Sequence, residues 1–216
     1  TNAACHGTST GSLTATASGG STPYEYSING GAYQASGTFT GLAQGTYTIT
    51  ARDAASETAV ATATITEPAS ALSGYIVSHT DVLCFGAVTG TLDVSGMGGT
   101  SPYLYKIGTG SFQASGSFTN LASGTYNVLI QDANLCTFTV TADITQPASA
   151  LAGTIMVQTN VFCNGGTNAS VTVAGSGGTA PYQYNINGGL FQTTGIFTSL
   201  AAGSYTVLVQ DANNCT

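Results

Sequence analysis

The chain contains very little charge. Charged residues make up 5% of its 216 residues, against roughly 25% in an average soluble domain. Arg52 and Lys106 are the two cationic residues, so no basic patch is available to neutralise the phosphates of nucleic acid or the headgroups of an anionic membrane. No run of about 18 apolar residues occurs, so no segment is expected to insert into a bilayer. Solubility must then come from Ser, Thr, Asn, Gln and Gly, a composition typical of secreted surface and fibre proteins.

What the chain does have is a repeat of constant length, without insertions. Residues of one type recur at equivalent positions in three copies, as in Cys5, Cys84 and Cys163, Pro23, Pro102 and Pro181, Tyr47, Tyr126 and Tyr205, and Asp53, Asp132 and Asp211. A period of this length suits a small domain with its own core. We expect three repeats, 1–72, 73–151 and 152–216, the first clipped at its N-terminal end and the third at its C-terminal end. The chain is interpreted as a segment of a longer protein.

In each repeat, side chains that face the core alternate with side chains that face solvent, as is typical of short strands. In the second repeat Tyr103, Tyr105 and Ile107 share one face of a strand, which is the expected core face. Asn-Gly pairs at 29–30 and 187–188 supply the positive φ angles of tight hairpin turns. About seven short strands in each repeat and no helical period predict an all-β fold, built of tandem immunoglobulin-like antiparallel β-sandwiches.

One tyrosine of each repeat follows a short turn. In the second repeat the segment 121–126 ends in Tyr126 and resembles the tyrosine corner of immunoglobulin-like sandwiches. We expect its hydroxyl to bond to the backbone of the turn. The repeats are joined by 67–72 and 146–151, which are too short to let domains tumble freely, so a semi-rigid array is predicted.

The five cysteines indicate disulfides in an oxidising compartment. The separation of Cys84 from Cys136 is the same as that of Cys163 from Cys215. This identical spacing predicts one disulfide within each of the second and third repeats. The equivalent position of the first repeat is Glu57, so Cys5 is expected to be unpaired or to bind a partner outside this chain. A metal site is the alternative, but the cysteines do not form close pairs and no histidine recurs beside them.

No catalytic, cofactor or metal site is predicted. His6 and His79 occupy positions that are not equivalent in the repeat, and no nucleophile elbow is present. One recurrent aspartate per repeat falls short of the six to eight oxygens that calcium requires. An aspartate in a turn more often accepts hydrogen bonds from the neighbouring backbone.

Several short motifs in a fixed order resemble the SprB-type repeat of large Bacteroidota cell-surface adhesins. In the second repeat they are Cys-Phe-Gly from Cys84, Gly-Gly-Thr-Ser-Pro-Tyr from 98, Gly-Thr-Tyr from 124 and Gln-Asp-Ala-Asn-Leu-Cys from 131. The resemblance covers all three repeats, and Glu57 departs from it. It implies an extracellular adhesin at the cell surface, exported by the type IX system, with the repeats acting as a stalk. Some such adhesins move along the surface during gliding.

The leading hypothesis is therefore structural: non-catalytic repeats that form the extended stalk or filament of a secreted adhesin and support adhesion or gliding. The alternative is a polysaccharide-binding module that uses the hairpin aromatics Tyr33, Phe112 and Phe191. Low charge also leaves little repulsion against lateral self-association of such filaments. Hydrolysis is the remotest reading, since it would depend on His79.

Overall fold

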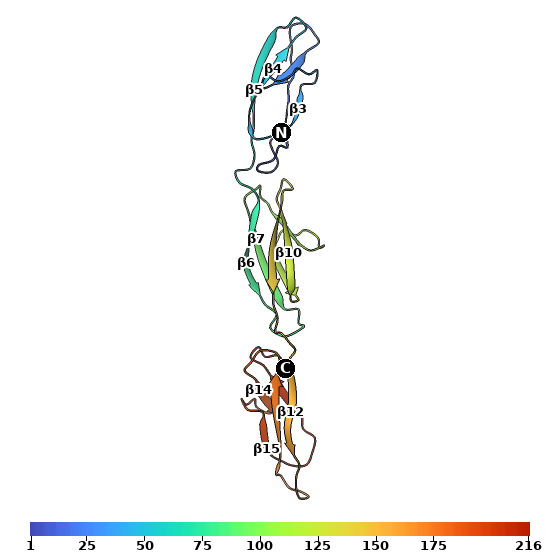
Figure 1. Cartoon of the computed structure of the whole chain (residues 1–216), viewed down its shortest axis with the longest axis vertical. Helices are drawn as coiled ribbons and strands as arrows, with labels where there is room; N and C mark the ends of the chain where they lie inside the picture. The colour runs from blue at the N-terminus through green and yellow to red at the C-terminus, as the bar shows by residue number, and fades with distance from the viewer. The chain divides into compact units, whose positions relative to one another are not determined.

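The computed structural model describes residues 1–216 and is built of strands only (Figure 1). The first repeat contains β1 Gly11–Thr14, β2 Glu25–Ile28, β3 Thr38–Leu42, β4 Gly45–Arg52 and β5 Thr58–Ile65. The second contains β6 Ser73–Thr80, β7 Gly90–Met97, β8 Leu104–Ile107, β9 Ser117–Leu121, β10 Gly124–Gln131 and β11 Thr137–Ile144. The third contains β12 Ala152–Thr159, β13 Ala169–Ser176, β14 Gln183–Ile186, β15 Ile196–Leu200 and β16 Val207–Gln210. No helix suited to crossing a bilayer is present.

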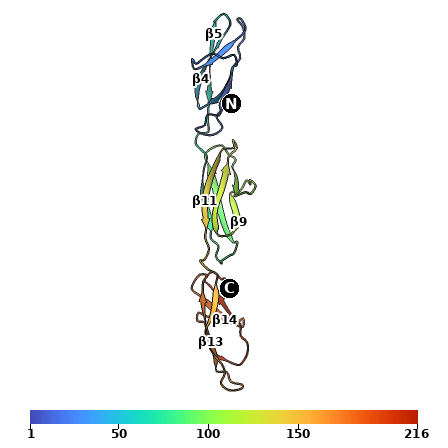
Figure 2. The ribbon, with the colours of Figure 1, turned by 45° about the vertical axis from the view of Figure 1, so that its right-hand side comes forward.

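Every repeat consists of two small sheets. In the second repeat one sheet has the order β6-β7-β9 and the other β11-β10-β8. Figure 2 labels β9 and β11, one strand from each of these sheets. The first repeat has β1-β3 and β2-β4-β5, and the third has β12-β13-β15 and β14-β16. The all-β, immunoglobulin-like sandwich architecture is thus confirmed. The second repeat contains six strands and an isolated antiparallel bridge between Tyr105 and Gln113, where about seven strands were expected.

The core lies where the alternating tyrosines predicted it. Tyr26, Tyr105 and Tyr184 are buried, and the Tyr105 hydroxyl accepts a hydrogen bond from the Gly96 N–H at 3.0 Å. In the second repeat Val128 and Ile130 of β10 are fully buried around it. A buried tyrosine whose hydroxyl has a partner contributes its apolar surface without leaving a polar group unsatisfied.

Two predicted turn features are present. Asn29 and Gly30 have φ angles of 52° and 72°, which match the hairpin that Asn-Gly favours. The Tyr126 hydroxyl donates a hydrogen bond to the Ala122 carbonyl at 3.0 Å, which confirms the tyrosine corner. The same bond joins Tyr47 to Ala43 and Tyr205 to Ala201.

The chain divides into two compact units, and both include parts of the second repeat. The first unit consists of Thr1–Ile76, Val94–Gly116 and Asn127–Thr141. The second consists of Val77–Asp93, Ser117–Tyr126 and Ala142–Thr216. The repeat boundaries at 72/73 and 151/152 stay a prediction of the sequence.

Candidate functional site: disulfide joints between repeats

Each compact unit contains one disulfide that joins two successive repeats. Cys5 is bonded to Cys136 with a Cα–Cα distance of 5.8 Å, and Cys84 is bonded to Cys215 with a Cα–Cα distance of 5.7 Å. Both bonds span 131 residues. In each case the loop near the start of one repeat is tied to the turn that follows β10 or β16 in the next repeat. We call this loop–turn contact a joint.

The joints correct the predicted pairing within repeats. Cys136 comes directly before β11, whereas Val82, two residues before Cys84, donates a backbone hydrogen bond to Thr145, directly after β11. An eight-residue strand is roughly 26 Å long, and a disulfide needs Cα atoms within about 7 Å. Cys84 and Cys136 therefore cannot pair. Cys5, expected to lack a partner in the chain, has one, and the exposed Cys163, expected to be bonded to Cys215, is free.

The turn of each joint is shaped by a buried aspartate. Oδ1 of Asp132 accepts hydrogen bonds from the N–H groups of Asn134 and Cys136, and Oδ2 accepts one from the N–H of Thr100, each at 2.9 Å. Asp211 makes the same three bonds in the third repeat. Because the carboxylate satisfies three backbone donors, the turn holds its cysteine in a fixed position. This use of the aspartates is the turn cap that the sequence favoured.

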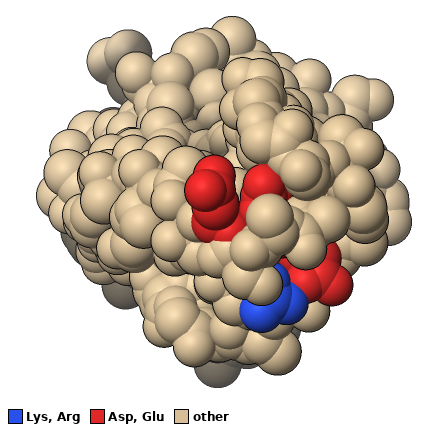
Figure 3. All heavy atoms as spheres, turned by 90° about the horizontal axis from the view of Figure 1, so that it is seen from above, with Lys and Arg blue, Asp and Glu red and all other residues tan.

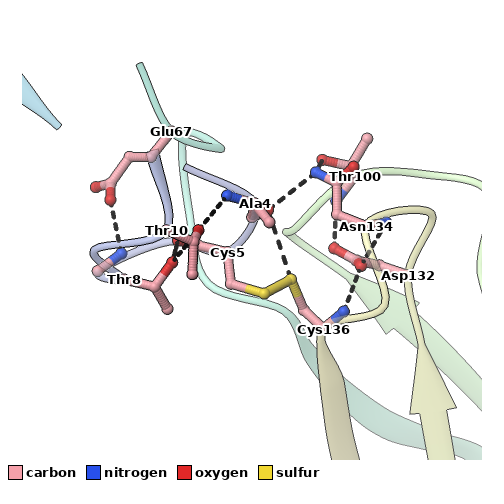
Figure 4. The surroundings of a disulfide bond; sticks show 10 residues. Ala4, Cys5, Thr8, Thr10, Glu67, Thr100, Asp132, Asn134 and Cys136 are labelled. Carbon is pink, nitrogen blue, oxygen red and sulfur yellow. Dashed lines mark hydrogen bonds between the residues drawn. A yellow bond between two sulfur atoms is a disulfide. The ribbon is translucent and has the colours of Figure 1, made fainter. Parts of the chain in front are cut away.

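An asparagine side chain connects the turn to the loop. Nδ2 of Asn134 donates to the carbonyl of Ala4 at 2.9 Å and lies 3.0 Å from Oγ1 of Thr100 (Figure 4). In the second joint Nδ2 of Asn213 donates to the carbonyl of Leu83 at 3.1 Å. In each joint, the asparagine two residues before the turn cysteine is thus hydrogen-bonded to the residue directly before the loop cysteine. This hydrogen bond supplements the disulfide.

The linker between repeats is also fixed at both of its ends. Oε2 of Glu67 accepts a hydrogen bond from the Gly7 N–H at 2.7 Å, and Gln146 does the same for Gly86 at 2.8 Å. At the other end, a Cβ on Gly98 would lie 2.1 Å from the carbonyl oxygen of Ala71. Only glycine allows this close approach. Gly98, at a φ angle of 71°, thus receives the linker.

The first repeat has the same turn without the joint. Oδ1 of Asp53 accepts hydrogen bonds from the N–H groups of Ala55 and Glu57, and Oδ2 accepts one from Ser21. These backbone bonds, the one from Ser21 foremost, lower the pKa of the Asp53 carboxyl. Ala55 and Glu57 stand where the other two repeats have asparagine and cysteine.

Charged groups are few at the surface. Figure 3 shows one end of the chain, where most atoms belong to uncharged residues and a cationic side chain lies beside a carboxylate. Nδ1 of His6 lies 3.0 Å from Oε1 of Glu67 beside the first joint, and the side chain of Glu67 is 11% exposed. Groups of three or more His, Cys, Asp and Glu side chains suited to a metal ion are absent.

The hairpin aromatics lie apart from the joints. Tyr33 is half-buried, with the Arg52 guanidinium 4.0 Å from its ring centroid, and the Lys106 ammonium lies 4.9 Å from that of Phe112. Phe191 is 39% exposed. Both cations of the chain are thus placed against an aromatic ring.

Sequence reasoning missed the asparagines of the joint, although a signal was available. Asn134 and Asn213 occur in the two turns that also carry a cysteine, and both residue types are missing together from the equivalent turn of the first repeat. Residues that are kept or lost together across internal repeats indicate a shared contact.

Tandem sandwiches of one kind, cross-linked through disulfides, define a class of structural repeat proteins. The SprB repeat family model matches residues 1–33, 76–112 and 156–191, one segment in each of the three repeats, which is consistent with SprB-type repeats. This match indicates a structural repeat of an adhesin-type region. Together with the disulfides, the match indicates an extracellular or cell-surface protein.

Among solved structures, similar chains come from tandem-domain proteins. The three N-terminal domains of the outer capsid protein Hoc of bacteriophage RB49 are 14% identical, with 91% of this chain and 73% of that chain covered and a TM-score of 0.38. The N-terminal eight Ig domains of Down syndrome cell adhesion molecule are 16% identical, with 83% and 30% covered and a TM-score of 0.31. Extracellular domains 3–5 of Drosophila OTK are 12% identical, with 89% and 82% covered and a TM-score of 0.31. No curated protein matches the chain.

Proposed function

We propose that this chain is part of the stalk of a large cell-surface adhesin, in which disulfide joints limit how far the stalk can be stretched. The observation that carries the proposal is the pairing of Cys5 with Cys136 and of Cys84 with Cys215, each from one repeat to the next. The repeats act as domains at 1–72, 73–151 and 152–216.

The joints change the path that a pulling force follows. From Thr1 the shortest covalent path reaches Cys5, crosses to Cys136, runs back along the chain to Cys84, crosses to Cys215 and ends at Thr216. Roughly 57 residues lie on this path, which at about 3.5 Å each gives a fully stretched length of roughly 200 Å. The reduced chain of 216 residues would stretch to roughly 750 Å.

Single-molecule pulling from the two chain ends tests this proposal. The oxidised chain should stop lengthening at roughly 200 Å, and the same molecule in dithiothreitol at roughly 750 Å. A C84S/C215S variant keeps one joint and provides the matched control, with an expected limit of about 300 Å because about 84 residues then lie on the path. An oxidised chain that extends as far as the reduced one would refute the mechanical role.

The proposed role in adhesion is tested separately on cells that display the chain between an anchor and an adhesive tip. Cells whose chain lacks both joints, through C5S/C136S combined with C84S/C215S, should detach at lower shear than cells with intact joints. Cells carrying C163S should behave as the parent. Equal detachment of all three strains would separate the mechanical property from adhesion. In gliding bacteria the same strains would show whether the joints contribute to motility.

Polysaccharide binding through the hairpin aromatics is the second candidate. It is favoured by the exposure of Phe191 and of its neighbour Leu190, which is 96% exposed. It is disfavoured at the other two positions, because a cation covers one ring face of Tyr33 and of Phe112. Binding on a glycan array that is lost with F191A and retained with Y33A would support a site in the third repeat.

A further inference from the structure

The two cysteines of each joint have different surroundings. Cys136 and Cys215, in the turns, are each 9% exposed, whereas Cys5 and Cys84, in the loops, are partly exposed and directly precede residues that face solvent. We propose that thiol–disulfide exchange enters each joint at the loop cysteine, and that the turn cysteine is the leaving and resolving thiol. This assignment rests on the joints alone and is independent of their mechanical role.

Access favours the loop sulfur as the point of attack. An incoming thiolate must reach the attacked sulfur from the side opposite to the sulfur that leaves, so exchange depends on which sulfur is open to solvent. In the second joint Leu83 and Phe85, on either side of Cys84, are 54% and 47% exposed. Cys215 is buried in the turn, where its N–H donates to Oδ1 of Asp211 at 2.9 Å. The fixed turn therefore shields its sulfur while the loop presents the other one.

The surroundings of the turn sulfur also decide how fast exchange runs. Sγ of Cys136 lies 3.5 Å from the carbonyl oxygen of Ala4, and the carboxylate of Asp132 accepts the N–H of the same cysteine. Sγ of Cys215 lies 3.5 Å from the Leu83 carbonyl oxygen in the second joint. Oxygen atoms with negative charge stabilise a departing thiolate poorly, and a poorly stabilised thiolate leaves slowly. Exchange through the loop cysteine should therefore be slow.

The step transfers one disulfide bond from the joint to an external thiol. A thiolate bonds to Sγ of Cys84 and the bond from Cys84 to Cys215 breaks. The electron pair stays on Sγ of Cys215, which takes a proton from water. Formation of the joint from a mixed disulfide is the reverse, in which Cys215 loses its proton, attacks Sγ of Cys84 and releases the external thiolate. The turn sulfur never bonds to an external thiol.

The opened joint keeps the resolving thiol in place. Nδ2 of Asn213 donates to the Leu83 carbonyl at 3.1 Å, a contact that does not require the disulfide. Cys215 should therefore stay beside the loop after the disulfide opens, which gives it a high effective concentration toward Cys84. A mixed disulfide on Cys84 should be short-lived, and the joint should re-form.

The first test compares the two thiols of the second joint one at a time. Both variants carry C163S, which removes the free exposed thiol. C163S/C215S leaves Cys84 as a thiol, and C163S/C84S leaves Cys215. With the chromogenic disulfide dithionitrobenzoate, Cys84 should react about ten times faster than Cys215 or more, because reactivity follows exposure of the thiolate. In denaturant the two thiols should react at equal rates, which shows that the fold causes the difference.

The second test needs no change in either joint. The oxidised C163S chain is treated with reduced glutathione, the reaction is stopped with acid, and free thiols are blocked with a maleimide. Mass spectrometry of the peptides should find glutathione on Cys5 and Cys84 and the maleimide on Cys136 and Cys215.

Glutathione on the turn cysteines, or in equal amounts on both cysteines of a joint, would overturn the assignment. Equal reaction rates of Cys84 and Cys215 in the folded variants would have the same consequence. Neither result would change the stretched length expected of the oxidised chain, because that length depends on which cysteines are paired and not on which sulfur is attacked.

Discussion

The turn before the last strand of the first repeat and that of the second have one shape and different contacts. Asp53 and Asp132 each accept three backbone hydrogen bonds at 2.9 Å from equivalent positions. The turn of the second repeat contacts the loop of the preceding repeat through Asn134 and Cys136. The aspartate therefore makes the turn, and two further side chains make the joint.

The largest effect is expected from giving the first repeat these two side chains. The A55N/E57C variant keeps the turn cap of Asp53 and gains a cysteine that can bond to the free Cys163 of another copy. Non-reducing gel electrophoresis should then show a ladder of disulfide-linked oligomers, absent from the parent chain. The same variant with C163S is the control. A dimer band in this control would show that the new cysteines pair with each other and that the loop is not selective.

Removal of one joint comes next in size. Closing a loop of 131 residues stabilises by roughly 5 kcal/mol in the chain-entropy model. C84A/C215A should lower the free energy of unfolding of the second unit by about that amount in denaturant titrations. C163A, which removes a free exposed thiol, should leave it unchanged. Equal effects of both variants would mean that the Cys84–Cys215 bond contributes little.

The turn cap gives a smaller effect. D132A leaves three backbone N–H groups of the turn without their acceptor, and Asp132 is 2% exposed. We expect a loss of about 3 kcal/mol, since buried donors without partners cost about 1 kcal/mol or more each. N134A, which removes only the contact to the loop, should cost about 1 kcal/mol. A larger loss for N134A would reverse the assigned roles of the two residues.

The smallest effect is the acid response of the turn in the first repeat. The pKa of Asp53 is lowered from its ordinary value of 3.8, chiefly by the Ser21 N–H. The cap is therefore fully stabilising above about pH 3.8 and is lost as the pH falls through the lower pKa of the folded chain. Hydrogen exchange of the Glu57 amide should accelerate over that range, after correction for intrinsic rates. In D53N, which does not ionise, the pH dependence should disappear.

The fold followed from local patterns, and the joint did not. Alternating tyrosines, Asn-Gly turns and the Tyr126 corner each depend on residues close in sequence, so they could be predicted and were found. Pairing of cysteines depends on which ends of the strands meet. Pairing within a repeat and pairing between neighbouring repeats each give a cysteine spacing that occurs twice, because the repeats are equal in length. Each scheme also leaves one of the five cysteines unpaired. The length of β11, which separates Cys136 from the end near Cys84, decides between them.

Because every joint takes its loop from one repeat and its turn from the next, cross-linking depends on neighbours alone. Removing one whole repeat would bring Cys5 into the same relation to the former Cys215 that it now has to Cys136. Gene recombination could thus shorten or lengthen such an array by complete repeats while every turn cysteine still met a loop cysteine of the preceding repeat. Changes of any other length would leave thiols stranded, so the chemistry of the joint would itself favour variation in whole copies.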